Sequence, residues 1–210
     1  SRSGLLAPIL ATFGLSILID NLLFERFGAD TRSLAPYLGD LAYASWSLTD
    51  EIDIGELSLL IFVAALALLG GLQLLLSFTP LGARIRATAA DPDTVGLLGI
   101  DARRTNAIAA AIAMATVGIA GAAMAMRATF DPFAGEAQMI FAFEAAVIGG
   151  VGSLWGTFVG GLVLGVAQTL GAQVSPQGFF IAGHAAFLCV LLLRLRSAEF
   201  RSWLRARAAA

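Results

Sequence analysis

Long apolar stretches separated by polar segments dominate the pattern of residues along the chain. A membrane-spanning helix needs about 20 mostly apolar residues. The stretches Leu5–Phe24, Leu57–Phe78 and Asn106–Met126 reach this length, and Phe179–Leu193 is shorter but strongly apolar. The pattern predicts an all-α protein, folded as a polytopic bundle of transmembrane helices.

One further apolar stretch, Ala137–Leu170, is too long for a single ordinary span. The glycine-rich segment Gly149–Gly156 interrupts it, so we expect one piece at Met139–Val151 and a second at Trp155–Leu170. At ~1.5 Å per residue the first piece extends about 20 Å, less than the ~30 Å hydrocarbon core. It is therefore either a span extended by its flanks or a broken, partly re-entrant element. With this split the chain has about six spanning segments.

The arginines are distributed unevenly and predict the orientation of the helices. If the first residues, the 79–105 loop and the 194–210 tail share one side, that side holds ten of the thirteen arginines. The 25–56 loop on the other side carries seven acidic residues. Because arginine excess marks the cytoplasmic side, we expect both termini to be cytoplasmic. The basic tail is expected to be attracted to anionic membrane lipid.

Composition narrows the classes of function. The chain is 58% hydrophobic and only 13% charged, against about 25% charged in a soluble domain. It has no lysine, and a phosphate-binding P-loop requires one, so any ATP must be hydrolysed by another subunit. One cysteine, Cys189, and one histidine, His184, form no metal cluster. We expect no enzyme activity, no cofactor and no nucleic-acid partner.

The polar 79–105 loop has helix punctuation of its own. Asp91 suits an N-cap and Pro92 the first helical position, while Gly99 suits a helix exit that needs a positive φ. These residues predict a short helix at roughly Pro92–Leu98, and Leu81–Ala90 reads as a second short helix. The alternative is a simple connector with arginines placed by the orientation rule. The candidate docking residues of the loop are Arg84, Arg86, Asp91, Pro92, Leu97, Leu98, Gly99 and Ile100.

Three motifs carry a resemblance to a known family. The segment Leu81–Pro92, followed by Gly96–Ile100, closely resembles the cytoplasmic loop of permease subunits of branched-chain amino-acid ABC transporters. Ala146–Gly156 with Gly160–Gly165 resembles that family's glycine-rich segment, and Leu6–Ser16 is a third match. The resemblance covers essentially the whole chain in order. It is strongest to the subunit type that pairs with a related second permease.

The resemblance implies a mechanism and a set of partners. Two permease subunits would form the pathway in a bacterial inner membrane, two cytoplasmic ABC ATPase subunits would drive it, and a periplasmic binding protein would deliver the amino acid. The 82–100 loop would sit in a cleft of the ATPase. Relatives usually have further spans before the segment that matches Leu6–Ser16, so residues 1–210 are expected to be one permease domain lacking its N-terminal spans. Trp155 stands where relatives often have proline, which we expect to alter only a turn.

Other residues are candidates for packing or for the pathway. Glu144 lies in an apolar stretch, where a carboxylate costs about 2.5–3.5 kcal/mol, so it either contacts a substrate ammonium or is neutral or paired for structure. Phe141 is a second candidate pathway residue, whereas we expect His184 to be a hydrogen-bonded packing residue. Small residues spaced by four let helices approach closely in lipid. Those predicted to pack in this way are Gly152, Gly156, Gly160, Gly161 and Gly165.

Three alternatives remain open from the sequence. Within the family, urea or short amides could replace branched-chain amino acids as the substrate. A secondary transporter that works without ATP would show inverted repeats and intramembrane ion-coupling groups; the sequence has no clear repeat, and Glu144 is its only deeply placed acid. A membrane scaffold without a pathway is the third alternative.

Overall fold

The fold is known from a computed structural model, which describes residues 3–49 and 52–208. The chain divides into two compact units, Ser1–Phe133 and Ala134–Ala210, and each is described by itself. Both consist mainly of helices, as the all-α prediction expects.

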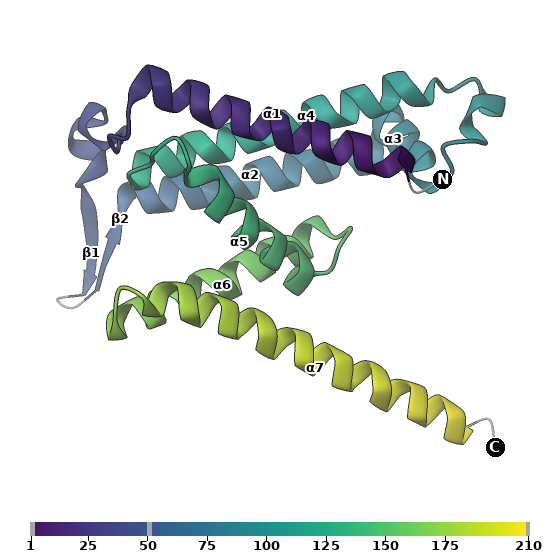
Figure 1. Ribbon diagram of the computed structural model, residues 1–210. Helices are drawn as coiled ribbons and strands as arrows, with labels where there is room; N and C mark the ends of the chain where they lie inside the picture. Colours follow the sequence, from purple (N-terminus) through teal and green to yellow (C-terminus); the bar gives the residue numbers. More distant parts are fainter. Residues whose placement is uncertain (1–2, 50–51, 209–210) are drawn as a thin grey trace. The chain divides into compact units, whose positions relative to one another are not determined.

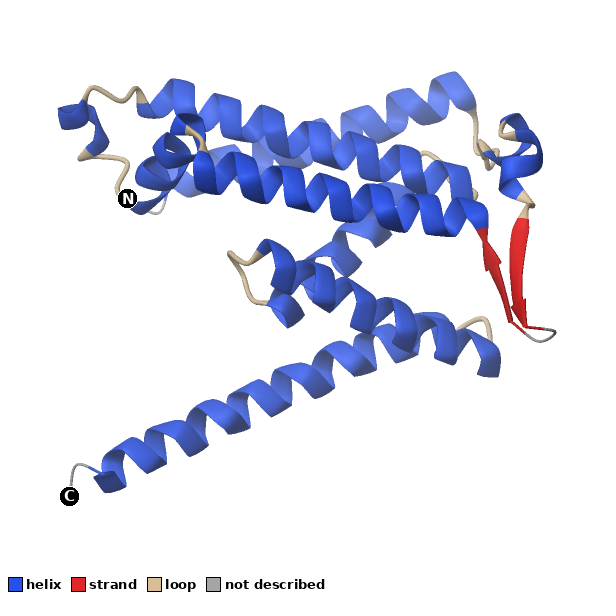
Figure 2. Ribbon diagram, turned by 180° about the vertical axis from the view of Figure 1, so that it is seen from behind, coloured by secondary structure: helices blue, strands red, loops and turns tan. Residues whose placement is uncertain are grey.

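The first unit is organised around three long helices, α1 (Ser3–Phe27), α2 (Glu56–Phe78) and α4 (Ala102–Arg127). They run alongside one another in both ribbon views (Figures 1 and 2). A short helix, α3 (Pro80–Ala90), follows α2 and packs on both α2 and α4. The start of α1 lies at the same end of the unit as α3 and the loop after it (Figure 1).

The opposite end of the first unit carries an extended element that the sequence analysis did not predict. The strands β1 (Ser45–Thr49) and β2 (Ile52–Gly55) form a two-stranded antiparallel hairpin, drawn in red in Figure 2. Two short 3₁₀ helices, η1 (Ala35–Tyr37) and η2 (Gly39–Ala42), precede it. Apolar and polar residues alternate in both strands, a period of two that is typical of strands.

The second unit is a compact arrangement of α5 (Ala134–Gly149), α6 (Leu154–Val174) and α7 (Gly178–Ala208). Its buried core is formed by Ala145, Ile148 and Leu164. The predicted interruption of the Ala137–Leu170 stretch is confirmed, because α5 ends at Gly149 and α6 begins at Leu154. The turn between them includes two glycines with positive φ, 96° at Gly150 and 94° at Gly152.

Three helices among the described residues are long and apolar enough to cross a membrane: α2, α4 and α6. The apolar part of α7, Gly178–Arg194, is shorter. The 16 residues of α5 extend about 24 Å at the α-helical rise. The predicted span Leu5–Phe24 lies within α1.

Two of the expected features fall partly outside the described residues. Asp50 and Glu51 of the acidic 25–56 loop are among them. The expected basic tail continues α7 as helix to Ala208, but the side chains of Arg201, Arg205 and Arg207 are likewise outside the described set.

Candidate functional site

The segment between α2 and α4 has a defined shape because side chains cap the N-termini of α3 and α4. The Thr79 hydroxyl begins α3 and accepts a hydrogen bond from the Gly82 N–H at 3.0 Å. Asp101 begins α4 in the same way, accepting from the Arg104 N–H at 3.0 Å. A Cβ on Gly82 would overlap the backbone of Leu76. The chain therefore turns back tightly between α2 and α3.

Asp91 organises the middle of this loop. Its Oδ1 accepts hydrogen bonds from the N–H groups of Asp93 at 3.2 Å and Thr94 at 3.1 Å, and its Oδ2 accepts one from the Thr94 hydroxyl. The bond from the Thr94 side chain is the main reason that the pKa of Asp91 lies below its ordinary value, and the bonds from the two N–H groups also lower it. The carboxylate is thereby held in its charged, capping form.

The helix predicted at Pro92–Leu98 is shorter than expected. Residues 92–94 form a turn, and the helical part is the 3₁₀ helix η3 (Val95–Leu98). Two physical features account for the difference: Asp91 holds the turn through two successive N–H groups, and Gly96 disfavours an α-helix. The predicted exit is confirmed, because Gly99 has a left-handed φ of 73°. That conformation favours glycine.

The apolar residues of the loop separate into an anchor and an exposed tip. Val95 is only 3% exposed, whereas Leu97 and Leu98 are 86% and 74% exposed. Ile100 is half-buried and donates its N–H to the Val95 carbonyl at 3.2 Å. The buried Val95, which we call the anchor, and its hydrogen bond from Ile100 hold η3 in place. The two exposed leucines therefore protrude from a constrained turn.

Arginines surround this tip in the sequence, and they are exposed in the structure. Arg84 and Arg86 lie exposed on α3, and Arg103 and Arg104 are exposed in the first turn of α4. Pro92 is also exposed. Interfaces between proteins are typically apolar at the centre and polar at the rim, with arginine enriched. The exposed surface of the loop has the composition of a protein-docking surface.

A second candidate region is the trio of helices α5, α6 and α7, which pack closely together. Gly160 of α6 is buried, and a Cβ there would overlap the Ala145 carbonyl of α5. A Cβ on Gly156 would likewise overlap the Gly149 carbonyl. Glycine therefore allows the two backbones to touch, as small residues do in lipid.

The other three predicted packing glycines have different surroundings. Gly161 and Gly165 face open space: within the described part of the chain, nothing lies within 4 Å of a Cβ at either position. Gly152 lies in the α5–α6 turn with a φ of 94°. Its glycine serves the turn, because L side chains rarely adopt that conformation.

Glu144 and His184, which the sequence did not connect, are brought together across α5 and α7. The His184 Nδ1 and Glu144 Oε1 atoms are 2.6 Å apart. Phe141, one turn before Glu144, stacks on the His184 ring with centroids 5.7 Å apart and an angle of 20° between the planes. The two predicted pathway residues are therefore both neighbours of the single histidine.

Sequence reasoning also missed contacts at both ends of this helix trio. Gly171 of α6 and Gly178 of α7 approach so closely that a Cβ on either would overlap the other's carbonyl. Arg194 donates a hydrogen bond to the Val147 carbonyl, near the end of α5, at 2.9 Å. The available signal for the first contact was the pair of glycines, Gly171 and Gly178, on either side of the turn between α6 and α7. The second contact has no local signal, because Arg194 and Val147 are 47 residues apart.

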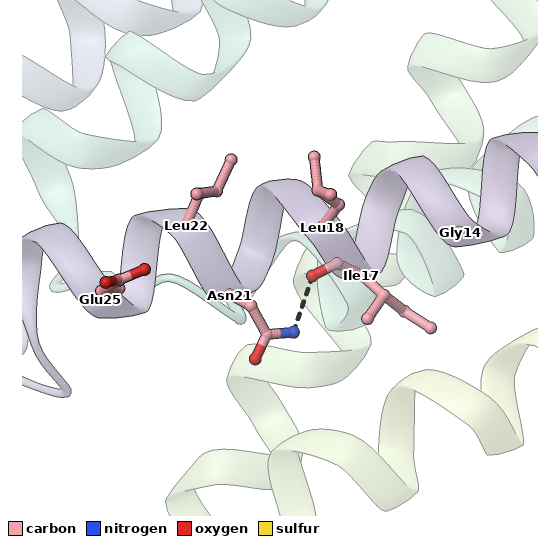
Figure 3. Close-up of a pocket in the computed structure, with 6 residues that line it drawn as sticks. All are labelled: Gly14, Ile17, Leu18, Asn21, Leu22 and Glu25. Carbon is pink, nitrogen blue, oxygen red and sulfur yellow. Dashed lines mark hydrogen bonds between the residues drawn. The ribbon is translucent and has the colours of Figure 1, made fainter.

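Described residues of the first unit line at least two hollows. One, of about 350 Å³, is lined by one face of α1 alone and includes Asn21, whose Nδ2 donates to the Ile17 carbonyl at 2.7 Å (Figure 3). The other, of about 700 Å³, is lined by residues within 23–37 and 130–132. There Arg32 lies 4.9 Å above the Phe27 ring, and its backbone N–H bonds the Phe130 carbonyl at 2.8 Å. The pairing of Arg32 with Phe130 ties the 28–34 segment to the segment after α4.

The part of the chain that the structure describes has no group of three or more His, Cys, Asp or Glu residues placed to hold a metal ion. Cys189 is a free, exposed thiol.

Comparison with known proteins defines the family. The family described as the permease component of branched-chain amino acid transport systems matches residues 8–200. The chain belongs to this family. The branched-chain amino acid ABC permease family is thus shown for almost the whole of the sequence, and with it the membrane assignment made from the apolar helices.

Named relatives of this permease family are similar over about nine tenths of the chain. The high-affinity branched-chain amino acid transport system permease protein BraD of Pseudomonas aeruginosa is 32% identical over 192 residues, 90% of this chain and 62% of the relative. The permease protein LivH of Escherichia coli K12 is 27% identical over 194 residues, 91% of this chain and 63% of the relative. The chain thus spans about three fifths of these relatives' length. No solved structure matches the chain.

Proposed function

We propose that this permease-family chain forms part of the translocation pathway of an ATP-driven importer for branched-chain or related amino acids. Its partners are a second permease subunit, cytoplasmic ABC ATPase subunits and a periplasmic amino-acid-binding protein. The names of the relatives, which refer to branched-chain amino acid transport, support the substrate class. The ATPase subunits supply the nucleotide chemistry, because this sequence has no lysine for a P-loop.

The observation that carries the coupling proposal is the exposed leucine pair of η3. Leu97 and Leu98 are 86% and 74% exposed on a turn held by Asp91, Gly99 and buried Val95. A pre-ordered turn loses little conformational freedom when it binds. Its apolar tip therefore enters a groove of the ATPase, and closure of that groove moves α3 and the helices that adjoin it.

The charge distribution supports a cytoplasmic position for this loop. Arg84, Arg86, Arg103 and Arg104 are exposed beside it, and excess arginine marks the cytoplasmic side. The start of α1 lies at the same end of the first unit as this loop (Figures 1 and 2). The hairpin and the acidic loop then face the opposite side, where the binding protein docks, and both termini of the chain are cytoplasmic in a bacterial inner membrane.

The decisive experiment is co-purification of the ATPase with loop variants. The double substitution Leu97→Ala and Leu98→Ala removes the exposed tip without touching the anchor Val95. We expect retention of the ATPase to fall by about tenfold or more, because truncation of a central apolar contact costs more than about 1–2 kcal/mol. ATP-dependent uptake of leucine into proteoliposomes should fall with it.

The matched control is another pair of adjacent, exposed leucines, Leu59 and Leu60, which are 39% and 51% exposed on the apolar helix α2. Their replacement by alanine should leave ATPase retention unchanged. Uptake that continues without any ATPase subunit would exclude the importer and favour a secondary transporter. Uptake of urea or acetamide, with none of leucine, would keep the coupling proposal and replace the substrate.

A further inference from the structure

The Glu144–His184 pair consists of one reachable and one unreachable group. Glu144 is buried at 5% exposure, whereas the His184 side chain is 46% exposed. The two are joined by the 2.6 Å contact between Oε1 and Nδ1. A small ligand can therefore approach the imidazole ring but not the carboxylate behind it. Direct contact between Glu144 and a substrate ammonium is disfavoured by this arrangement.

Within the part of the chain that the structure describes, two buried polar atoms near this pair lack hydrogen-bond partners. Among the described residues, Glu144 Oε2 and Gln168 Nε2 are buried with no hydrogen-bond partner. Gln168, on α6, lies against Gly183, the residue before His184, since a Cβ there would be 3.0 Å from Nε2. Buried polar groups without partners are rare and costly. Polar side chains of α5, α6 and α7 thus lie at about the same level of the second unit.

The short contact constrains which atom carries a hydrogen. Two bare acceptors would repel one another at 2.6 Å, so a hydrogen lies between Nδ1 and Oε1. Because Nδ1 faces Glu144, Nε2 is the ring nitrogen left for a ligand. Nε2 is a donor when the ring is an imidazolium beside the carboxylate, or when a protonated carboxyl donates to Nδ1, and it is an acceptor when a neutral ring donates from Nδ1.

The surroundings of the ring are aromatic. Phe141 stacks on His184 and is also in contact with Phe179 and Phe180, at centroid distances of 6.0 and 6.1 Å. Phe180 is 51% exposed. A hydrogen-bond donor next to an exposed aromatic surface fits a molecule with an acceptor at one end and an apolar group at the other.

We propose that His184 Nε2 donates a hydrogen bond to the α-carboxylate of the transported amino acid, whose apolar side chain lies on the Phe141–Phe180 surface. Glu144 is a positioning residue: it fixes the ring and the donor state of Nε2 without touching the substrate. The inference rests on the proposed function, because it needs an amino-acid substrate in the pathway. Ionisable groups within membrane helices almost always face a cavity or the bundle interior, which accords with a pathway-facing ring.

The single histidine makes a direct test practical, since His184 is the only one in this sequence. The chain, assembled with its ATPase and second permease in lipid nanodiscs, is labelled with ¹⁵N-histidine and titrated with leucine. The Nε2 resonance of His184 should move with leucine and stay in place with isoamylamine, which keeps the amine and the branched side chain but has no carboxylate or other acceptor in its place. An equal response to both compounds, or to neither, would overturn the proposal.

Uptake assays separate this inference from the proposed function. We expect His184→Phe, which keeps an aromatic ring but removes the donor, to raise the KM for leucine by about tenfold, the size of a lost hydrogen bond to a charged group. Glu144→Gln should also raise KM and should displace the Nε2 resonance before any leucine is added. The control Gln173→Ala, an exposed amide on α6, should leave KM unchanged. If wild-type uptake is normal and His184→Phe has the same KM, only the histidine contact is wrong. If the wild-type complex takes up no leucine, the proposed function itself fails.

Discussion

Glycine and polar side chains shape both the loop between α2 and α4 and the α5–α6–α7 trio. In the two regions, however, the residues that interact are separated by very different distances along the sequence. In the loop, Asp91 bonds residues two and three positions away, and Gly99 reverses the chain where it stands. In the trio, Glu144 bonds a residue 40 positions away, and Gly160 is needed because Ala145 of another helix occupies its side-chain space.

This difference determines what each region presents. Local hydrogen bonds and the buried Val95 shape the loop without using Leu97 and Leu98, so these two leucines remain exposed. In the trio, the glycines and polar side chains instead make contacts between helices, and the His184 side chain remains accessible at the polar level. The exposed tip of the loop suits the contact with another subunit that we propose, whereas the trio is closely packed around one polar pair.

The largest effect should come from adding a methyl group where the trio is tightest. Gly160→Ala would place a Cβ against the Ala145 carbonyl and should destabilise the protein by about 1–3 kcal/mol, as overpacking does. The adjacent Gly161→Ala, which meets open space within the described residues, should be neutral or slightly stabilising, since alanine is the better helix former. Unfolding midpoints in detergent would measure both. Equal midpoints for the two variants would show that α5 and α6 do not touch at Gly160.

Sequence reasoning succeeded where the signal was local and failed where it was not. The exit of the loop at Gly99 was predicted because its neighbours decide its conformation. Asp91, expected as the N-cap of a helix, instead ends α3 and bonds the 92–94 turn, and Thr94 precedes η3. The partner of Glu144 could not be predicted, because nothing in the sequence sets the rotation of α7 that turns His184 toward α5. Gly156 and Gly161 look alike as members of four-residue repeats, and only the placement of α5 tells a packing glycine from an exposed one. The β1–β2 hairpin had a period-two signal that was overlooked.

A smaller effect, confined to the loop, should follow from replacing its left-handed glycine. Gly99→Ala forces an L side chain to a φ of 73° and should cost about 1–2 kcal/mol. The Ile100 N–H, bonded to the Val95 carbonyl, should then exchange with solvent about 5–30-fold faster. Gly96→Ala is the matched control, since Gly96 has no positive φ and no atom of the described chain near its Cβ position. Unchanged exchange in Gly99→Ala would mean that the turn does not need its left-handed residue.

The smallest effect is the dependence of the loop turn on pH. The folded structure lowers the pKa of Asp91 below the ordinary 3.8, mainly through the Thr94 hydroxyl. A lowered pKa means that the cap stabilises the turn above the ordinary value and that this stabilisation is lost as pH falls through the folded value. The Thr94 amide resonance, followed from about pH 5 to about pH 2, should therefore titrate with a midpoint below 3.8. In Asp91→Asn the same resonance should show no such step. A midpoint at or above the ordinary value would remove Asp91 as the residue that holds η3 in place, and the pre-ordered tip would need another cause.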